Sequence, residues 1–188
     1  RRSFFRQSLR QLLGPVVESL DEKVRQIEHK FTKHVTPTFL RPPGALGERE
    51  FLDTCSRCGK CVEVCPVSAI RLEAGEASGA PFINPDVAAC VVCPELAWMS
   101  SCPSGALVMT RMFEIDMGTA RWNEATCKRS KGEDCTICVD QCPIGEVAIK
   151  MDGRRVVVVD DGCIGCGVCQ QVCPTKPKSI KIEPCARP

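Results

Sequence analysis

CSRCGKCVEVCP, residues 55–66, sets four cysteines at the spacing C-x2-C-x2-C-x3-C and follows the last one with proline. This is the ligand spacing of cubane iron–sulfur clusters. Three closely spaced thiolates wrap a loop around one cluster, and the fourth points away and ligates the neighbouring cluster. Proline has no N–H, so it ends the local helical turn. The stretch therefore predicts a fold organised around metal clusters.

Three further cysteine groups follow in the chain. The last group repeats the first spacing, with Cys163, Cys166, Cys169 and Cys173. The third has a longer first gap but keeps the C-x2-C-x3-C-P ending, with Cys127, Cys135, Cys138 and Cys142. The second has only Cys90, Cys93 and Cys102, and Trp98 stands where its third ligand is expected. We therefore expect cluster ligands at Cys55, Cys58, Cys61, Cys65 and at the eleven cysteines of the other groups.

The composition agrees with a metal protein. There are 16 cysteines among 188 residues, no tyrosine and only 5% aromatic residues, so large rings alone do not build the interior. A disulfide scaffold would not repeat this regular spacing, and zinc sites use pairs of C-x2-C separated by a longer spacer. The net charge of +2 gives no support to a nucleic-acid partner.

Short apolar segments follow each group at 69–72, 106–109, 147–150 and 179–182, and strand-like pieces recur at 82–83, 120–122 and 156–159. The repeating unit is a cysteine motif, a strand, a turn such as Asp152-Gly153 and a second strand. We expect an α+β fold of bacterial-type dicluster units over residues 48–188, preceded by an extended Pro/Gly linker at 36–47.

Residues 1–35 have a different pattern. Apolar residues recur at three- and four-residue steps from Phe5 to Phe31, which predicts an amphipathic helix. His29 and His34 lie at its polar end and are expected to be solvated. The helix is a candidate docking element for a partner subunit or a membrane surface. The opening RRSFFRQ is similar to a twin-arginine export signal, but the apolar stretch behind it is interrupted by charges.

The order and spacing of the groups over residues 48–184, with the long first gap of the third group, resemble NapG- and MauM-type polyferredoxins. The chain is also similar to the four-cluster electron-transfer subunits of molybdopterin oxidoreductases. Both resemblances imply four clusters arranged as an electron wire. Successive groups are separated by 25, 25 and 21 positions, so tandem pairing of groups one with two and three with four is as feasible as nested pairing. The resemblance favours the nested arrangement.

The second group leaves one cluster without a thiolate ligand. Three outcomes compete: a [3Fe-4S] cluster with Trp98 filling the vacated corner, a [4Fe-4S] cluster with another ligand such as Cys185, or an empty site with Trp98 as core. We favour the first, beside three [4Fe-4S] clusters. A missing thiolate removes one negative charge and should raise the potential of that cluster.

We expect an electron-transfer protein rather than an enzyme, because the sequence has no convincing nucleophile–base pair and no Gly-rich phosphate loop. A redox protein or the subunits of a larger oxidoreductase are the expected partners. The alternatives are a free-standing polyferredoxin and a structural or regulatory iron–sulfur protein. The expected compartment is the cytoplasm or the cytoplasmic membrane surface, with twin-arginine export to the periplasm as the alternative.

Overall fold

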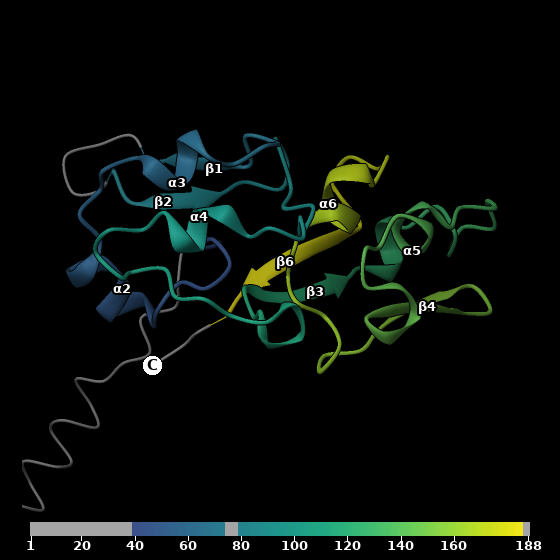
Figure 1. Cartoon of the computed structure of the whole chain (residues 1–188). Coiled ribbons are helices and arrows are strands. Elements are labelled where there is room, and N and C mark those ends of the chain that lie inside the picture. The colour runs from purple at the N-terminus through teal and green to yellow at the C-terminus, as the bar shows by residue number, and fades with distance from the viewer. Residues whose placement is uncertain (1–38, 74–78, 186–188) are drawn as a thin grey trace, which may run out of the picture. The chain divides into compact units, whose positions relative to one another are not determined.

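The chain divides into two units, residues 1–35 and 36–188, and the computed structural model describes residues 39–73 and 79–185 of the second (Figure 1). The predicted amphipathic helix, with His29 and His34, lies outside the described residues. Within the described ranges, no helix is long and apolar enough to cross a membrane.

The helices are short and follow the cysteine groups. After α2 (Glu48–Thr54), each group contributes one helix: α3 (Lys60–Glu63), α4 (Ala97–Ser100), α5 (Ile137–Asp140) and α6 (Val168–Val172). Gly59 and Gly167 are the N-cap residues that precede α3 and α6, and their φ angles of 76° and 88° suit glycine. Each of the four ends before a Cys-Pro pair, because the residue before proline disfavours helical backbone.

The strands form three two-stranded antiparallel sheets. Two are hairpins, β1 (Ile70–Leu72) with β2 (Pro81–Ile83) and β4 (Ile149–Asp152) with β5 (Arg155–Val158). The third pairs β3 (Gly118–Trp122) with β6 (Ile180–Pro184). Short 3-10 helices occur at η1 (Met112–Glu114), η2 (Glu124–Thr126) and η3 (Gly145–Val147). The α+β class and the turn at Asp152-Gly153 are confirmed, since Asp152 pairs with Arg155 across that turn.

Two modules result, which we define as residues 39–110 and 118–185. In the second, the first and last strands, β3 and β6, pair with one another. The first closes similarly: the N–H of Leu46 donates to the Ala106 carbonyl at 3.1 Å, and the N–H of Val108 donates to the Gly44 carbonyl at 2.8 Å. The strand expected at 106–109 is reduced to this short pairing, because Pro42 and Pro43 before its partner have no N–H to extend it.

Residues 39–47 are packed, unlike the extended linker expected for 36–47. Leu40 is 5% exposed, and Pro42 and Pro43 are among the most deeply buried side chains. The Arg41 guanidinium, 9% exposed, pairs with Glu48 at 2.7 Å and with Glu73 at 2.9 Å. It also donates to the Pro81 carbonyl at 3.1 Å. This network ties residues 39–47 to α2 and to the β1–β2 hairpin.

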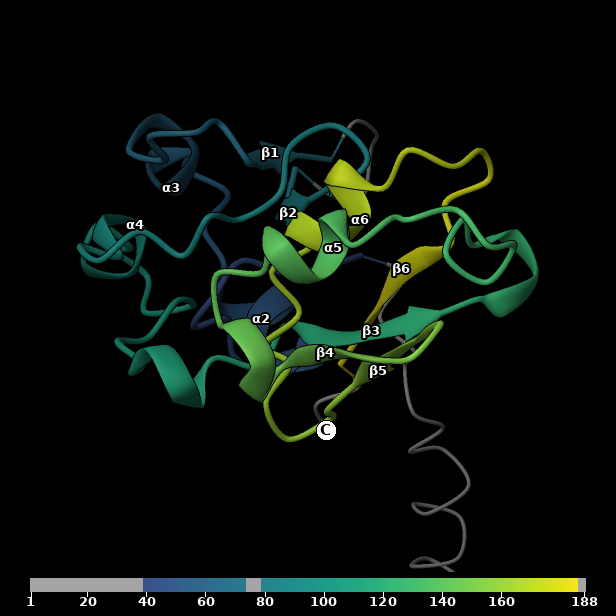
Figure 2. The ribbon, with the colours of Figure 1, turned by 90° about the vertical axis from the view of Figure 1, so that its right-hand side faces the viewer.

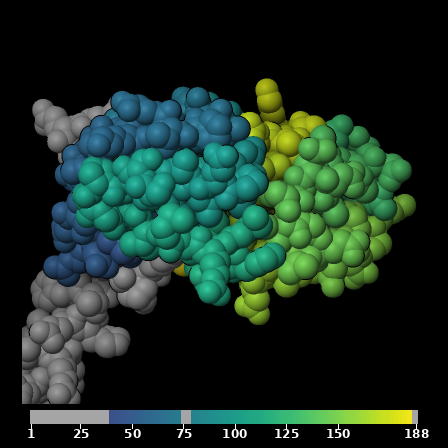
Figure 3. Space-filling model, viewed as in Figure 1, coloured from purple at the N-terminus to yellow at the C-terminus, as the bar shows by residue number. Residues whose placement is uncertain are grey.

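Two hydrophobic clusters form the interior, and cysteines belong to both. One is centred on the first module but also contains Ile164 and Cys166 of the second, and the other lies within the second module. In the first, Phe51 and Trp98 are among the most deeply buried side chains. The second is built around Ala120, Val156 and Ile180. Figure 2 shows α3 beside α4, and α5 beside α6, as the contacts between these helices also indicate. In Figure 3 the two modules meet along a continuous boundary, with the first in blue to teal and most of the second in green.

Candidate cluster-binding sites

The four short helices place equivalent side chains at equivalent positions. The second residue of each helix is the third member of its cysteine group: Cys61, Trp98, Cys138 and Cys169. Trp98 therefore stands in a ligand position by structure as well as by sequence, on a helix of the same length as α3 and α5.

Site I consists of Cys55, Cys58, Cys61 and Cys102. Burial raises the pKa of Cys61 to about 11, and the nearby charges of Cys55, Cys58 and Cys102 add to the rise. Cys102 also raises the pKa of Cys58, although a backbone N–H bond from Lys60 lowers it overall. The last cysteine of the second group thus completes the set begun by the first group.

Site II consists of Cys65, Cys90 and Cys93. These three cysteines and Trp98 line one pocket, with about 230 Å³ of space that is partly open to solvent. Burial raises the pKa of Cys90 to about 12, and Cys166, Cys93 and Cys65 add to the rise. Trp98 is 1% exposed and forms part of the wall where a fourth ligand would stand.

Sites III and IV repeat the arrangement of site I in the second module. Cys127, Cys135, Cys138 and Cys173 line a pocket of about 340 Å³ and form site III. Burial raises the pKa of Cys138 to about 11, and the three others add to the rise. Site IV joins Cys142 to Cys163, Cys166 and Cys169: burial raises the pKa of Cys166 to about 11, and Cys142 and Cys163 contribute.

These sets correct one expectation. The nested arrangement would bring Cys102 to the third group and Cys65 to the fourth. Instead, Cys65 lines one pocket with Cys90 and Cys93, and Cys173 lines another with Cys138, so the pairing is tandem. The physical reason is local: the β1–β2 hairpin returns the chain, so that the second group lies beside the first, and β4–β5 does the same for the fourth and third.

Two hydroxyl groups that the cysteine spacing does not predict lie close to cysteine sulfur atoms at these sites. The Ser104 hydroxyl lies 3.6 Å from Cys102 Sγ, and the Thr175 hydroxyl lies 3.2 Å from Cys173 Sγ. Burial alone would raise the pKa of Cys102, but Ser104 and neighbouring backbone N–H groups lower it. Thr175 has the same effect on Cys173. The repeated sequence Cys-Pro-Ser/Thr was a signal that could have identified both.

The residues present fit iron–sulfur clusters. Buried thiols with raised pKa values resist ionisation at neutral pH, and bound iron supplies the positive charge that makes the thiolate favourable. Backbone donors already face sulfur, as the N–H of Ala120 does at 3.4 Å from Cys163 Sγ. Such N–H···S bonds hold ligands and tune cluster potentials.

Cys185 lies apart from these sets. Its thiol donates to Asp116 Oδ2 at 2.9 Å, and it lines a different pocket, together with Asp116 and Met117. This location does not favour Cys185 as a replacement ligand for site II.

Comparisons with known proteins agree with the sites. A family model described as "4Fe-4S dicluster domain" matches residues 133–176, and one described as "4Fe-4S binding domain" matches residues 51–71. The stretch 90–103, which contains Trp98, lies outside both matches.

Full-length relatives extend this agreement. The methylamine utilization ferredoxin-type protein MauM of Paracoccus denitrificans (strain Pd 1222) is 39% identical, over 77% of this chain and 71% of that protein. The ferredoxin-type protein NapG of Escherichia coli (strain K12) is 32% identical, over 77% and 70%. Among solved structures, a chain of the formate dehydrogenase - heterodisulfide reductase - formylmethanofuran dehydrogenase complex from Methanospirillum hungatei matches with 21% identity. It covers 84% of this chain and 56% of that chain, with a TM-score of 0.29, which is too low to compare the folds.

Proposed function

Because this chain belongs to the family of MauM- and NapG-type ferredoxin proteins, we propose that it carries single electrons along a row of four cluster sites. It is an iron–sulfur electron-transfer protein of the ferredoxin type, not a catalytic enzyme, and it binds 4Fe-4S clusters through its cysteines. The proposed order is site I, site II, site IV and site III.

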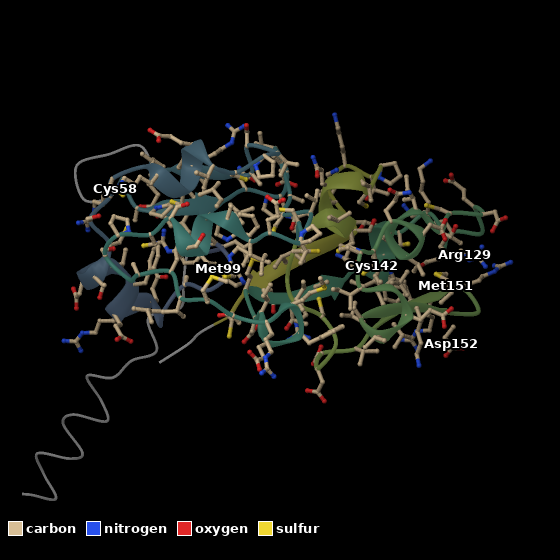
Figure 4. The ribbon with its side chains drawn as sticks, in the orientation of Figure 1. Cys58, Met99, Arg129, Cys142, Met151 and Asp152 are labelled. Carbon is tan, nitrogen blue, oxygen red and sulfur yellow. The ribbon has the colours of Figure 1, made fainter. Side chains whose placement is uncertain are left out.

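The observation that carries this order is the contact between sites II and IV. The N–H of Cys90, a site II ligand, donates to the carbonyl oxygen of Cys166, a site IV ligand, at 3.0 Å. Within each module the fourth cysteine of one group joins the other group, which links I to II and III to IV. Figure 4 agrees: Cys58 and Arg129 lie at opposite ends of the described body, with Met99 and Cys142 between them.

For the cofactors we propose [4Fe-4S] clusters in sites I, III and IV and a [3Fe-4S] cluster in site II. Trp98 takes the place of the thiolate that a fourth iron would need. With one thiolate fewer, site II should have the highest potential of the row, because net charge is one determinant of the potential.

Bound clusters supply the one-electron chemistry. The protein holds them with thiolates, donates N–H and O–H groups to sulfur, and excludes water with apolar side chains. At site II the side chains that exclude water line the pocket: Pro43, Ile70, Ile83 and Trp98.

The cluster content is tested on the anaerobically purified full chain by iron and sulfide analysis together with redox-monitored EPR. We expect a [3Fe-4S] signal in the oxidised protein and interacting [4Fe-4S] signals after reduction. Four cubanes by iron content with no [3Fe-4S] signal would overturn the assignment of site II. A second measurement separates electron transfer from a structural role. Clusters that carry electrons should lose their visible absorbance reversibly when dithionite reduces them, while the circular dichroism of the folded chain stays unchanged.

We further propose that a donor and an acceptor dock at opposite ends of the row, within a larger redox complex. Cys58 of site I is exposed, and Ile137 beside site III is 38% exposed, so both ends are accessible on the described body. Residues 1–35 are the proposed docking element. Their deletion should abolish co-purification with the partner while all clusters remain. Deletion must stop before Arg41, whose ion pairs belong to the body.

For the compartment we propose the cytoplasm or the cytoplasmic membrane surface, since Arg10, Gln11 and Glu18 interrupt the apolar stretch behind Arg1 and Arg2. Export by the twin-arginine route is the alternative. A fusion of the native gene to a reporter that is active only after export distinguishes the two: activity supports export, and its absence with normal expression supports the cytoplasm.

A further inference from the structure

Three buried polar side-chain atoms of the described residues lack a hydrogen-bond partner: Trp98 Nε1, Trp122 Nε1 and Ser130 Oγ. Buried polar groups in native proteins are nearly always paired, so each of these atoms needs an explanation. All three residues lie at the proposed cluster sites, and the two indoles are the only tryptophans of the chain. This common location points to a partner that binds at those sites.

Trp98 lies in a pocket that offers its indole one kind of side-chain acceptor. The described residues lining this pocket, besides Trp98, are the three cysteines of site II and six apolar residues: Pro43, Val67, Ala69, Ile70, Ile83 and Val91. Sulfur is therefore the only acceptor element among these side chains. A tryptophan that only filled the core would be expected to satisfy its N–H elsewhere.

Trp122 provides an internal parallel at site III. It lines that pocket beside Cys127, Cys138 and Cys173. A second buried indole N–H without a hydrogen-bond partner thus lies in a pocket lined by cysteines.

We propose that the Trp98 indole N–H donates a hydrogen bond to a sulfur atom of the cluster in site II, and that Trp98 is a positioning residue for a cluster held by three cysteines. This inference rests on the function proposed above. The second position of α4 is a thiolate position in the other three helices, and here it supplies a neutral donor in place of an anionic ligand.

Two consequences follow for site II. Loss of a thiolate and gain of an N–H···S bond both favour the more negative, reduced cluster, so both raise its potential. The indole ring, 1% exposed, also closes the vacated corner against water and against a fourth iron. Trp98 then sets both the composition and the potential of this site.

The test compares Trp98→Phe with the wild-type chain and uses Trp122→Phe as the matched control. Phenylalanine keeps an aromatic ring but removes the N–H. We expect Trp98→Phe to lower the midpoint potential of the [3Fe-4S] signal while the signals of the other sites stay unchanged. In deuterated water, pulsed EPR of the wild type should detect an exchangeable deuteron coupled to the [3Fe-4S] cluster, and the variant should lose it. Trp122→Phe should leave both site II readouts unchanged.

The outcomes separate this inference from the proposed function. A [3Fe-4S] signal whose potential and deuteron coupling are the same in Trp98→Phe overturns the role of the N–H but leaves the cluster assignment intact. Absence of that signal from the wild type overturns the assignment itself. If Trp98→Phe fails to retain the cluster, a second variant is used, in which benzothienylalanine replaces Trp98. This analogue keeps the shape of the indole ring but has no N–H, and the Trp122→Phe background makes Trp98 the only tryptophan that it can replace. A cluster retained there with an unchanged potential contradicts the proposal, and a lowered potential or a lost cluster supports it.

Discussion

The N–H of Cys90 donates a 3.0 Å hydrogen bond to the carbonyl oxygen of Cys166, so a ligand of site II and a ligand of site IV are joined through one backbone hydrogen bond. Neighbouring contacts hold this junction. Gln171 accepts from the N–H of Ala89 at 3.1 Å, and Gln170 donates to Asp86 at 2.9 Å. In the proposed order, the three-cysteine site lies inside the row, and electrons that pass between the modules would cross it.

Gly167→Ala should loosen this junction. A Cβ at Gly167 would lie 2.7 Å from the ring of Pro85, and φ is +88°. We expect a loss of stability of about 1–3 kcal/mol beyond the backbone strain, because overpacking of this kind costs that much. Electron transfer between sites II and IV should also slow, as followed by freeze-quench EPR. Gly153→Ala is the matched control, since its φ is +56° and nothing lies within 4 Å of the new Cβ. Equal effects of the two variants would contradict the close approach at Pro85.

Trp98→Cys should convert site II to a [4Fe-4S] site. The second residue of α4 occupies the position that Cys61 occupies in α3, so a thiolate there completes the ligand set. We expect one more iron per chain, loss of the [3Fe-4S] signal and a lower potential, because one negative charge is added. Met99→Cys, one residue further along the helix, should not increase the iron content. An unchanged iron content in Trp98→Cys would show that the position cannot ligate.

Arg41→Met should destabilise the first module by about 3–5 kcal/mol, because it leaves Glu48 and Glu73 buried without their cation. Chemical denaturation of the cluster-loaded chain measures the change. Arg121→Met is the control: Arg121 is 51% exposed in its ion pairs, and such pairs contribute at most about 1 kcal/mol. If both variants lost the same stability, residues 39–47 would not depend on the Arg41 network.

Removal of the clusters should abolish the cooperative unfolding transition of the body. The cysteine side chains are part of both hydrophobic cores, and the energy of metal binding becomes energy of folding when the site forms only in the folded chain. Chelation under anaerobic, reducing conditions followed by circular dichroism tests this. Cys185→Ser should keep its full iron content and its transition, because Cys185 contacts Asp116 rather than a cluster set. An apoprotein that unfolds at the same denaturant concentration would contradict the expectation.

The sequence was sufficient where the information is local. Regular cysteine spacing predicts the ligand groups, which remain a prediction, and the position of Trp98 follows from counting four residues back from Cys102. The structure places Trp98 at the position that the spacing indicates, as the second residue of α4. The hairpin at Asp152-Gly153 was also predictable, because a turn residue pair separates two apolar segments.

The pairing of the groups could not be predicted, because the separations are nearly equal and only tertiary strand pairing distinguishes the alternatives. The closing pair β3–β6 joins residues more than 50 positions apart, as in Trp122 with Ile180. The ion pair of Arg41 with Glu73 spans 32 positions, so the local Pro/Gly-rich composition of residues 36–47 predicts a linker and does not reveal the packing of residues 39–47. The proposed order of the sites rests on the hydrogen bond between Cys90 and Cys166. No repeat in the sequence indicates that these two residues lie side by side.

The pairing between the first and last extended segments of each module bears on how the chain could have evolved and how it could be engineered. Since β3 pairs with β6, and residues 44–46 pair with 106–108, the last extended segment of each module pairs with its first. A duplicated ferredoxin gene would produce such an architecture, and each copy could then diverge separately, as Trp98 in only one of them suggests. Exchange of either half would therefore have to preserve the contacts of Gln170 and Gln171 with Asp86 and Ala89, and the packing of Ile164 in the first cluster.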